Sequence, residues 1–196
     1  MSLPNDELLQ LFRAIVDIES VSRNERELAD AVEATLRGCA HLELLRDGDA
    51  LMARTNLGRA ERVIIAGHLD TVPVDSNLPS TISGSGDQVI VYGRGTCDMK
   101  GGIAVMVWLA QRLSEPNRDV TWVFYDCEEI ENAANGLGRL VARHPDWLKA
   151  DLAVLMEPTG AQIEGGCQGT MRFDITTTGV AAHSARSWLG HNAIHD

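Results

Sequence analysis

The sequence predicts an α/β fold, in which a mostly parallel mixed sheet is flanked by helices. Three unbroken apolar runs suit strands that are buried on both faces of a sheet, and they span residues 63–66, 120–125 and 152–156. Helical segments at 102–113 and 137–143 alternate with these strands, as is typical of α/β proteins. Polar residues follow each run, and in this architecture ligands collect beyond the carboxyl ends of the strands.

Two amphipathic helices and a pair of short strands are predicted before the first buried strand. Apolar residues recur at helical spacing over residues 8–18 and 28–36, and Gly38 ends the second helix. Residues 41–55 predict two short strands around an Asp-Gly-Asp turn at 47–49.

The pattern changes near the end of the chain, past the Gly-Gly pair at 165–166. Residues 171–178 alternate in the manner of a half-exposed, threonine-rich strand, and residues 190–196 resemble the opening of a helix. We therefore expect one domain over residues 1–170 and the beginning of a second domain over residues 171–196.

The composition indicates a globular protein with an acidic surface. The chain carries 28 acidic and 17 basic side chains, a formal charge of −11. Proteins that grip phosphates normally present a basic stripe, so this charge argues against a nucleic-acid or anionic-membrane partner. No apolar run approaches the roughly 18 to 20 residues of a membrane helix, and no secretory signal is recognisable, so we expect a cytoplasmic protein. Four widely spaced cysteines predict reduced thiols: Cys39, Cys97, Cys127 and Cys167.

His68 and Asp70 follow the first buried strand. In an extended chain, residues two apart point the same way, so these two side chains share a face. A metal-bound histidine usually donates its second ring N–H to a carboxylate or a carbonyl, which makes the pair a metal ligand and its orienting group. For this pair alone, a histidine and an aspartate that merely cap a strand end are an equally good interpretation.

Asp98 lies in a glycine-rich turn, residues 93–102, that leads into a helix. The turn fits neither G-x-x-x-x-G-K-[ST] nor G-x-G-x-x-G, because Gly101 follows Lys100 and Asp98 occupies the last glycine position. A nucleotide site, and with it a nicotinamide-dependent dehydrogenase, is therefore disfavoured.

Acidic residues crowd after the second and third buried strands. Asp126, Glu128, Glu129 and Glu131 lie within six residues, and Glu157 follows the third strand. A charge run is usually a solvated face. At the end of a buried strand, however, repulsion between crowded carboxylates is costly unless a positive group sits among them.

Taken together, the donors at these strand ends predict a hydrolytic metal centre, with four ligands: His68, Asp98, Glu129 and Glu157. Their nitrogen and oxygen atoms suit zinc, cobalt or manganese. Two divalent cations would balance three ligating carboxylates and one bridging hydroxide, so we expect two ions. Glu128, which is left without a metal, is then placed to take a proton from the bridging water.

The chain resembles the M20 group of dizinc amidohydrolases and peptidases in the order and spacing of four motifs: GHLDTVP, GRGTCDMKGG, DCEE and MEPT. Within that group it resembles the succinyl-diaminopimelate desuccinylases, on the segments CEEIENAANGLG, EGGCQGT and AHSARSWLGHNAIH. The resemblance covers essentially the whole chain. It implies a zinc-exopeptidase-like catalytic domain over residues 1–170 and the start of an α+β lid and dimerisation domain over residues 171–196.

The resemblance also implies a role for each candidate residue of the metal centre. His68 and Glu157 would bind one zinc ion, Glu129 would bind the other, and Asp98 would bridge the two. Asp70 would orient His68.

Further roles outside the ligand set follow from the same resemblance. Glu128 would be the general base and acid. His183 matches the lid-domain histidine that reaches across a homodimer and helps to stabilise the tetrahedral oxyanion, although from the residues alone a structural role is about as good an interpretation. Because the implied substrate carries several carboxylates, we expect Arg186 to bind one of them, with Arg94 and Lys100 as weaker candidates.

The implied reaction is hydrolysis of N-succinyl-LL-2,6-diaminopimelate to succinate and LL-2,6-diaminopimelate, a step of lysine biosynthesis. The main alternative is another M20 amide hydrolase, such as an acetylornithine deacetylase, an aminoacylase or a carboxypeptidase, and a non-catalytic metal-binding fragment is a further one. Family members are considerably longer, and the histidine of their second zinc site lies near the carboxyl terminus. We therefore expect this chain to be an amino-terminal portion that is inactive alone.

Overall fold

A computed structural model of the chain describes residues 3–4, 7–166, 169, 171 and 173–195. The chain forms two units, Met1–Ala161 and Gln162–Asp196. Cys167, one of the four cysteines considered above, lies outside the described residues.

A five-stranded sheet forms the centre of the first unit, with the strand order β1-β2-β6-β3-β7. Its strands are β1 (Glu43–Asp47), β2 (Ala50–Arg54), β3 (Arg62–His68), β6 (Asp119–Tyr125) and β7 (Leu152–Leu155). Strand β3 pairs in parallel with both β6 and β7, whereas β2 is antiparallel to β1 and to β6. The predicted mixed α/β sheet is confirmed, and the parallel strands bring their carboxyl ends to one edge.

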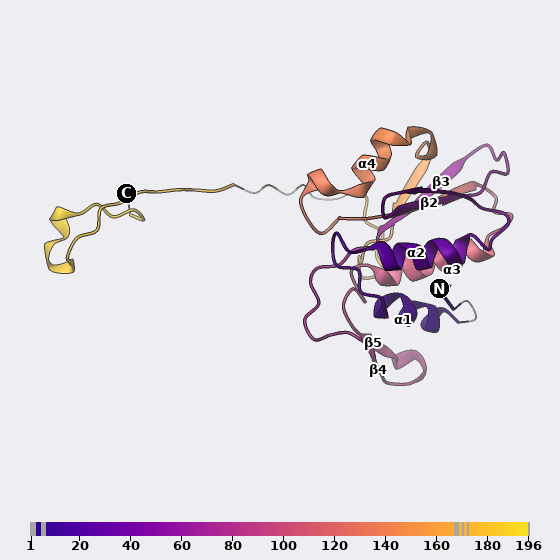
Figure 1. The fold of residues 1–196 in the computed structure, drawn as a ribbon, viewed down its shortest axis with the longest axis horizontal. Helices are drawn as coiled ribbons and strands as arrows, with labels where there is room; N and C mark the ends of the chain where they lie inside the picture. The colour runs from indigo at the N-terminus through magenta and orange to yellow at the C-terminus, as the bar shows by residue number, and fades with distance from the viewer. Residues whose placement is uncertain (1–2, 5–6, 167–168, 170, 172, 196) are drawn as a thin grey trace. The chain divides into compact units, whose positions relative to one another are not determined.

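Helices cover both faces of this sheet (Figure 1). Three lie on one side, namely α1 (Leu8–Asp17), α2 (Arg26–Leu36) and α3 (Lys100–Arg112), and α4 (Gly136–Arg143) lies on the other. Alternate residues of β6 supply the two cores, because successive side chains of a strand point to opposite faces. Trp122 and Phe124 pack in the cluster of α1, α2 and α3, whereas Val123 and Tyr125 pack with Leu140 of α4.

Local sequence signals explain the ends of several elements. The turn between β1 and β2 contains Gly48, whose φ of +66° lies in the left-handed region that glycine adopts without steric cost. Asn135 caps α4, because its side-chain oxygen accepts a hydrogen bond from the backbone N–H of Leu137 at 2.9 Å. These features stabilise the β1–β2 turn and the start of α4, which both lie near the carboxyl end of β6.

The remaining elements are short. Strands β4 (Thr81–Ser83) and β5 (Ile90–Tyr92) form a separate antiparallel pair, which lies between β3 and α3 in the sequence. In the second unit, residues Ser184–Leu189 form 3₁₀ turns with a kink at Arg186, and Val180 pairs with His191 in an isolated bridge.

Two predictions for the end of the chain are wrong. The described residues of 171–178 form no strand, and their apolar side chains Met171, Phe173 and Ile175 are exposed. Alternation specifies which side chains share a face, but a strand also needs a neighbouring strand to pair with. The described residues of 190–195 form the bridge at His191 and a turn in place of the opening of a helix.

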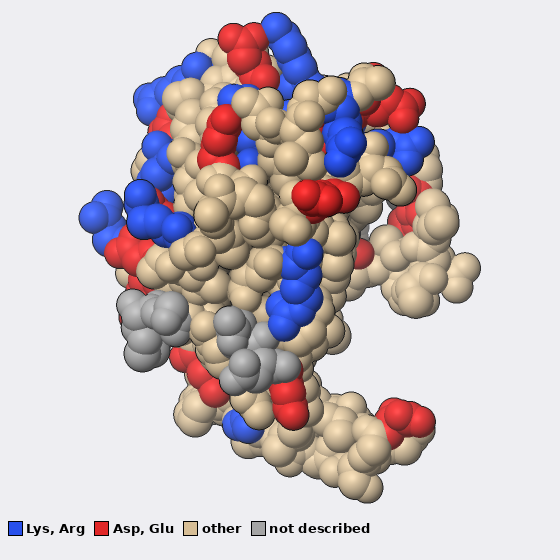
Figure 2. All heavy atoms as spheres, turned by 90° about the vertical axis from the view of Figure 1, so that its right-hand side faces the viewer, with Lys and Arg blue, Asp and Glu red and all other residues tan. Residues whose placement is uncertain are grey.

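The surface mixes charges of both signs. Figure 2 shows basic and acidic side chains interspersed on one face of the molecule. Several are paired, for example Arg54 with Glu43 at 2.8 Å and Arg118 with Glu61 at 2.7 Å. Within the part of the chain that the structure describes, no helix has the length and apolar character needed to cross a membrane.

Candidate metal centre

His68 is the last residue of β3, and it is fully buried at the carboxyl edge of the sheet. Its Nδ1 lies 2.9 Å from the backbone carbonyl of Asp70 and 3.5 Å from Asp70 Oδ1. A carbonyl oxygen can only accept, so this contact assigns the hydrogen to Nδ1 in the neutral ring. The lone pair of Nε2 then points toward the carboxylates described next.

Three carboxylates from separate loops face this nitrogen. Asp98 Oδ1 lies 3.1 Å from His68 Nε2, and Glu157 Oε2 lies 3.9 Å from it. Glu129, which follows β6, completes a group in which one ligand atom each of His68, Asp98 and Glu129 lies within 4.8 Å of the others. The structure therefore brings together all four residues that the sequence predicts as ligands.

The electrostatics of this group favour a cation. Burial alone lowers the pKa of His68, but the hydrogen bond and charge of Asp70, together with the charges of Glu157 and Asp98, outweigh it and raise that pKa to about 9. Burial raises the pKa of Glu129 and of Glu157, and neighbouring carboxylates raise both further. A single imidazole nitrogen among oxygen donors is a donor set that zinc and related divalent ions accept. The residues present thus fit a metal ion.

Besides its contact with His68, Asp70 accepts hydrogen bonds from the turn that follows β6. Its Oδ1 accepts the backbone N–H of Glu128 at 2.9 Å, and its Oδ2 accepts the backbone N–H of Glu129 at 3.0 Å and the hydroxyl of Ser22 at 2.7 Å. Burial opposes ionisation, but these hydrogen bonds and His68 keep the pKa of Asp70 low. One carboxylate therefore positions both the histidine and the turn that carries the two glutamates.

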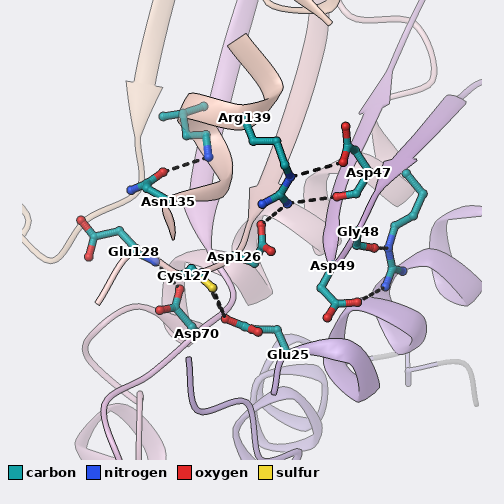
Figure 3. A network of polar contacts seen from close by, with 12 residues as sticks. Glu25, Asp47, Gly48, Asp49, Asp70, Asp126, Cys127, Glu128, Asn135 and Arg139 are labelled. Carbon is teal, nitrogen blue, oxygen red and sulfur yellow. Dashed lines mark hydrogen bonds and ion pairs between the residues drawn. The ribbon is translucent and has the colours of Figure 1, made fainter. Parts of the chain in front are cut away.

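An arginine braces the other side of this turn (Figure 3). Arg139 of α4 donates to Asp126 Oδ1 at 2.6 Å, to the backbone carbonyl of Asp47 at 3.1 Å and to Asp47 Oδ1 at 3.3 Å. The backbone N–H of Gly136 donates to the Asp126 carbonyl at 2.8 Å, and a Cβ at position 136 would lie 1.9 Å from Asp126 Oδ1. Glycine at this position permits the close approach of α4 to the end of β6.

The two weaker candidates for substrate binding differ in the structure. Arg94, Asp98 and Glu129 line a cavity of about 330 Å³, and Arg94 Nε is buried without a hydrogen-bond partner among the described residues. Lys100 is fully buried, and its Nζ donates to the backbone carbonyls of Val16 at 3.3 Å and Ile18 at 2.6 Å. Lys100 therefore stabilises the end of α1 and does not line this cavity.

His183 and Arg186 belong to the second unit. The backbone N–H of Ala185 donates to His183 Nδ1 at 3.1 Å, and the backbone N–H of Arg186 donates to the His183 carbonyl at 2.8 Å. Because Nδ1 accepts, the hydrogen of the neutral ring lies on Nε2. His183, Ala185 and Arg186 line a hollow of about 330 Å³ within that unit.

Several residues that shape the centre were not singled out in the sequence. Just before α2, Ser22 donates to Asp70 and Glu25 accepts from the turn after β6, and Arg139 reaches the end of β6 from α4. A serine followed three residues later by a glutamate could have marked the start of a helix, but nothing in that pattern indicates contact with a turn some 102 residues away.

The fold and the donor set place a candidate metal centre at the carboxyl edge of a mixed α/β sheet, and the comparison with known families identifies the class of protein. The profile of peptidase family M20/M25/M40 matches residues 64–186, which is more than half of the chain. The chain belongs to this family. The matched region includes all four candidate metal ligands, along with His183 and Arg186.

Two curated relatives have similar sequences. A protein of Mycobacterium tuberculosis, described as a succinyl-diaminopimelate desuccinylase DapE, is 56% identical over 188 residues, which cover 95% of this chain and 52% of that protein. The succinyl-diaminopimelate desuccinylase of Corynebacterium glutamicum is 48% identical over 190 residues, which cover 94% of this chain and 50% of the relative. The chain spans about half the length of these relatives.

A solved structure shares the fold. The M20 family metallo-carboxypeptidase Sso-CP2 from Sulfolobus solfataricus superimposes with a TM-score of 0.62 at 22% identity, over 77% of this chain and 37% of the other. At this identity the likeness shows the architecture alone, which is the mixed sheet with helices on both faces.

Proposed function

We propose that the chain contributes the metal centre of a succinyl-diaminopimelate desuccinylase, an amide hydrolase of lysine biosynthesis. The observation that carries the proposal is the group of His68, Asp98 and Glu129, whose ligand atoms converge at the carboxyl edge of the sheet. The substrate is proposed from the 56% and 48% identity to relatives described by that activity. In this proposal residues 1–170 belong to the catalytic domain and residues 171–196 begin a lid domain.

The ligand roles are proposed as follows. His68 and Glu157 would hold one zinc ion, Glu129 would hold a second, and Asp98 would serve both, with cobalt or manganese as substitutes. A divalent cation bound there supplies Lewis acidity and lowers the pKa of water. Asp70 holds His68 in the tautomer that keeps Nε2 free for a metal.

Glu128 is proposed as the general base and acid. Its backbone N–H is fixed on Asp70, and the pair of hydrogen bonds from residues 128 and 129 to one carboxylate orients the turn. The Glu128 carboxylate takes a proton from the attacking water and returns it to the leaving amine nitrogen, so that an amide and water yield a carboxylate and an amine.

Two cationic groups and a histidine are proposed to bind the substrate. Arg94 lines the cavity beside Asp98 and Glu129, and a guanidinium suits a substrate carboxylate there. Arg186 is the corresponding candidate in the second unit. His183 presents an Nε2–H donor, which is the form that can stabilise an oxyanion, and we propose that it does so across a homodimer.

We further propose that the enzyme works in the cytoplasm on a small molecule, without a nucleic-acid or membrane partner. The described thiols Cys39, Cys97 and Cys127 are free, which suits a reducing compartment. The formal charge of −11 opposes binding to phosphate-rich polymers.

Metal binding and amine release test this proposal. We expect the chain to bind zinc in a calorimetric titration. Joined to the carboxyl-terminal half of the Corynebacterium relative, it should hydrolyse succinyl-diaminopimelate faster than acetylornithine. Glu128→Gln should keep zinc binding and reduce kcat by at least about a thousandfold, in the range of general-base and activated-water effects together.

The control is Glu131→Gln in the same acidic run, which should leave kcat unchanged, because Glu131 pairs with Arg23 at the surface. Preference for acetylornithine would favour another amide hydrolase of the family. Absence of zinc binding would contradict the metal centre itself.

A further inference from the structure

The turn that carries Glu128 and Glu129 is held by two buried carboxylates, and only one of them belongs to the proposed metal centre. Three successive backbone N–H groups donate to these acids. Cys127 donates to Glu25 Oε1 at 3.1 Å and Glu128 to Asp70 Oδ1 at 2.9 Å (Figure 3). Glu129 donates to Asp70 Oδ2 at 3.0 Å. Consecutive N–H groups that converge on anions hold a backbone conformation firmly.

Cys127 is the strained residue of this turn. Its φ of +57° lies in the left-handed region, which a residue with a Cβ adopts only when its surroundings hold it there. The side chain is buried, and its Sγ lies 3.5 Å from Glu25 Oε1. Glu25 therefore accepts from both the amide and the thiol of the same residue.

Glu25 immediately precedes α2, and it is 1% exposed. Its Oε1 also accepts the backbone N–H of Arg23 at 2.9 Å. No arginine or lysine among the described residues forms an ion pair with it, so its charge is met by hydrogen-bond donors. A buried carboxylate is costly unless it is hydrogen-bonded, and the donors it finds come from its own loop and from the turn after β6.

We propose that Glu25 is a positioning residue for the proposed hydrolase, which holds Cys127 in its left-handed conformation and so sets the directions of Glu128 and Glu129. The inference rests on the roles proposed for those two glutamates. Without Glu25, Cys127 can relax toward the more favourable negative φ values. That relaxation rotates the peptide between residues 127 and 128, and it draws the Glu128 amide away from Asp70.

Hydrogen exchange on the metal-free chain tests the positional part directly. In Glu25→Ala, we expect the amides of residues 127–129 to exchange at least about tenfold faster, while the amides in the middle of β6 keep their rates. The matched control is Glu27→Ala, which removes an exposed glutamate from the first turn of the same helix. It should leave the turn unchanged. Unchanged exchange at 127–129 in Glu25→Ala, or an equal rise throughout the sheet, would overturn the proposal.

Cobalt(II) alone is the probe for the metal site. We expect Glu25→Ala to weaken cobalt binding about tenfold or more, and Glu25→Gln, which keeps an acceptor oxygen, to weaken it less. A second substitution, Cys127→Gly, should restore part of the affinity in the Glu25→Ala background, because glycine reaches the left-handed region without steric cost. Failure of this rescue would contradict a role through Cys127.

The two proposals fail in different ways. If the unaltered chain binds no cobalt, the proposed metal centre is wrong, and the exchange rates still decide whether Glu25 holds the turn. If Glu25→Ala does not fold, Glu25→Asp, whose shorter side chain draws the acceptor oxygen away from Cys127, takes its place. Faster exchange confined to residues 127–129 in that variant supports the proposal, and unchanged exchange overturns it.

Discussion

Acidic groups lie at both ends of strand β6, and the pKa of Asp119 at the amino end is lowered whereas that of Glu129 at the carboxyl end is raised. At its amino end, Asp119 accepts the Thr55 hydroxyl and the backbone N–H of Leu57, each at 2.8 Å, and the backbone N–H of Arg59 at 2.9 Å. Burial raises the pKa of Asp119, but these hydrogen bonds and the charge of Arg62 outweigh it, so the pKa is lowered. This carboxylate finds all its partners within the chain.

At the carboxyl edge of the sheet, where Glu129 follows β6 and Glu157 follows β7, the effects on the pKa have the reverse balance. Burial and the charges of neighbouring carboxylates raise the pKa of Glu129 and of Glu157, and His68 offsets only part of this effect. Asp119 therefore stabilises the fold, whereas the raised pKa values of Glu129 and Glu157 favour a cation beside them. The two ends can therefore be altered separately, with effects on stability at the amino end and on metal binding at the carboxyl end.

The largest expected effect is stabilisation by metal at the carboxyl end. Zinc at about a thousandfold above its dissociation constant should raise the free energy of unfolding by about 4 kcal/mol, because it binds the folded chain preferentially. In His68→Ala this increment should vanish. Urea denaturation with and without zinc measures it.

His195→Ala is the matched histidine control, since His195 is exposed in the second unit, and it should keep the full increment. Asp119→Ala should keep it as well. An increment that survives in His68→Ala would place the ion elsewhere and break the comparison between the two ends.

The next effect belongs to the amino end. Asp119→Ala leaves the N–H groups of Leu57 and Arg59 and the hydroxyl of Thr55 without their acceptor, and it should lower the free energy of unfolding by about 3 kcal/mol. Zinc affinity should stay unchanged. Glu115→Ala, which removes an exposed acid four residues earlier, should change stability by less than about 0.5 kcal/mol.

Much of this architecture could be predicted from the sequence, because fully buried strands leave unbroken apolar runs and their carboxyl ends leave polar clusters. The strands before His68, Asp126 and Glu157 were recognisable for this reason. The candidate donors could be proposed as well, because histidine and carboxylates are common ligands of hydrolytic metals, and the structure brings these side chains together. Asp70 was expected beside His68, and the structure adds its hydrogen bonds to the turn after β6.

What the sequence could not indicate are contacts between distant segments. Glu25 meets Cys127 across 102 residues, and Arg139 meets Asp47 across 92. In the sequence, Glu25 is one more acid near the start of a helix. Its contact with Cys127 depends on where the fold places the turn after β6, and no local sequence pattern indicates that position. The strand predicted at residues 171–178 failed for a related reason, because alternation does not provide a partner strand.

The smallest effect concerns repulsion at the carboxyl end. Without metal, Glu129→Gln should stabilise the chain by about 0.5 kcal/mol near neutral pH, because it removes one of the crowded charges in a site that solvent partly screens. The pKa of Glu129 is raised in the folded chain. Its contribution to the free energy of unfolding is therefore complete below the pKa of the unfolded chain and is lost as the pH rises through the pKa of the folded chain. The advantage of Glu129→Gln should therefore appear only as the pH increases above about 4.5.

Asp119 provides the opposite slope on the same strand. Because the pKa of Asp119 is lowered by folding, its contribution to stability is present above the pKa of the unfolded chain. That contribution is lost as the pH falls through the pKa of the folded chain. Asp119→Asn should therefore be less stable than the unaltered chain at neutral pH, and Glu129→Gln should be more stable. Both differences should shrink as the pH falls. Urea denaturation of both variants over one pH series measures the two slopes. Slopes of the same sign would show that both ends of β6 handle charge alike, and the separation of stability from metal binding would fail.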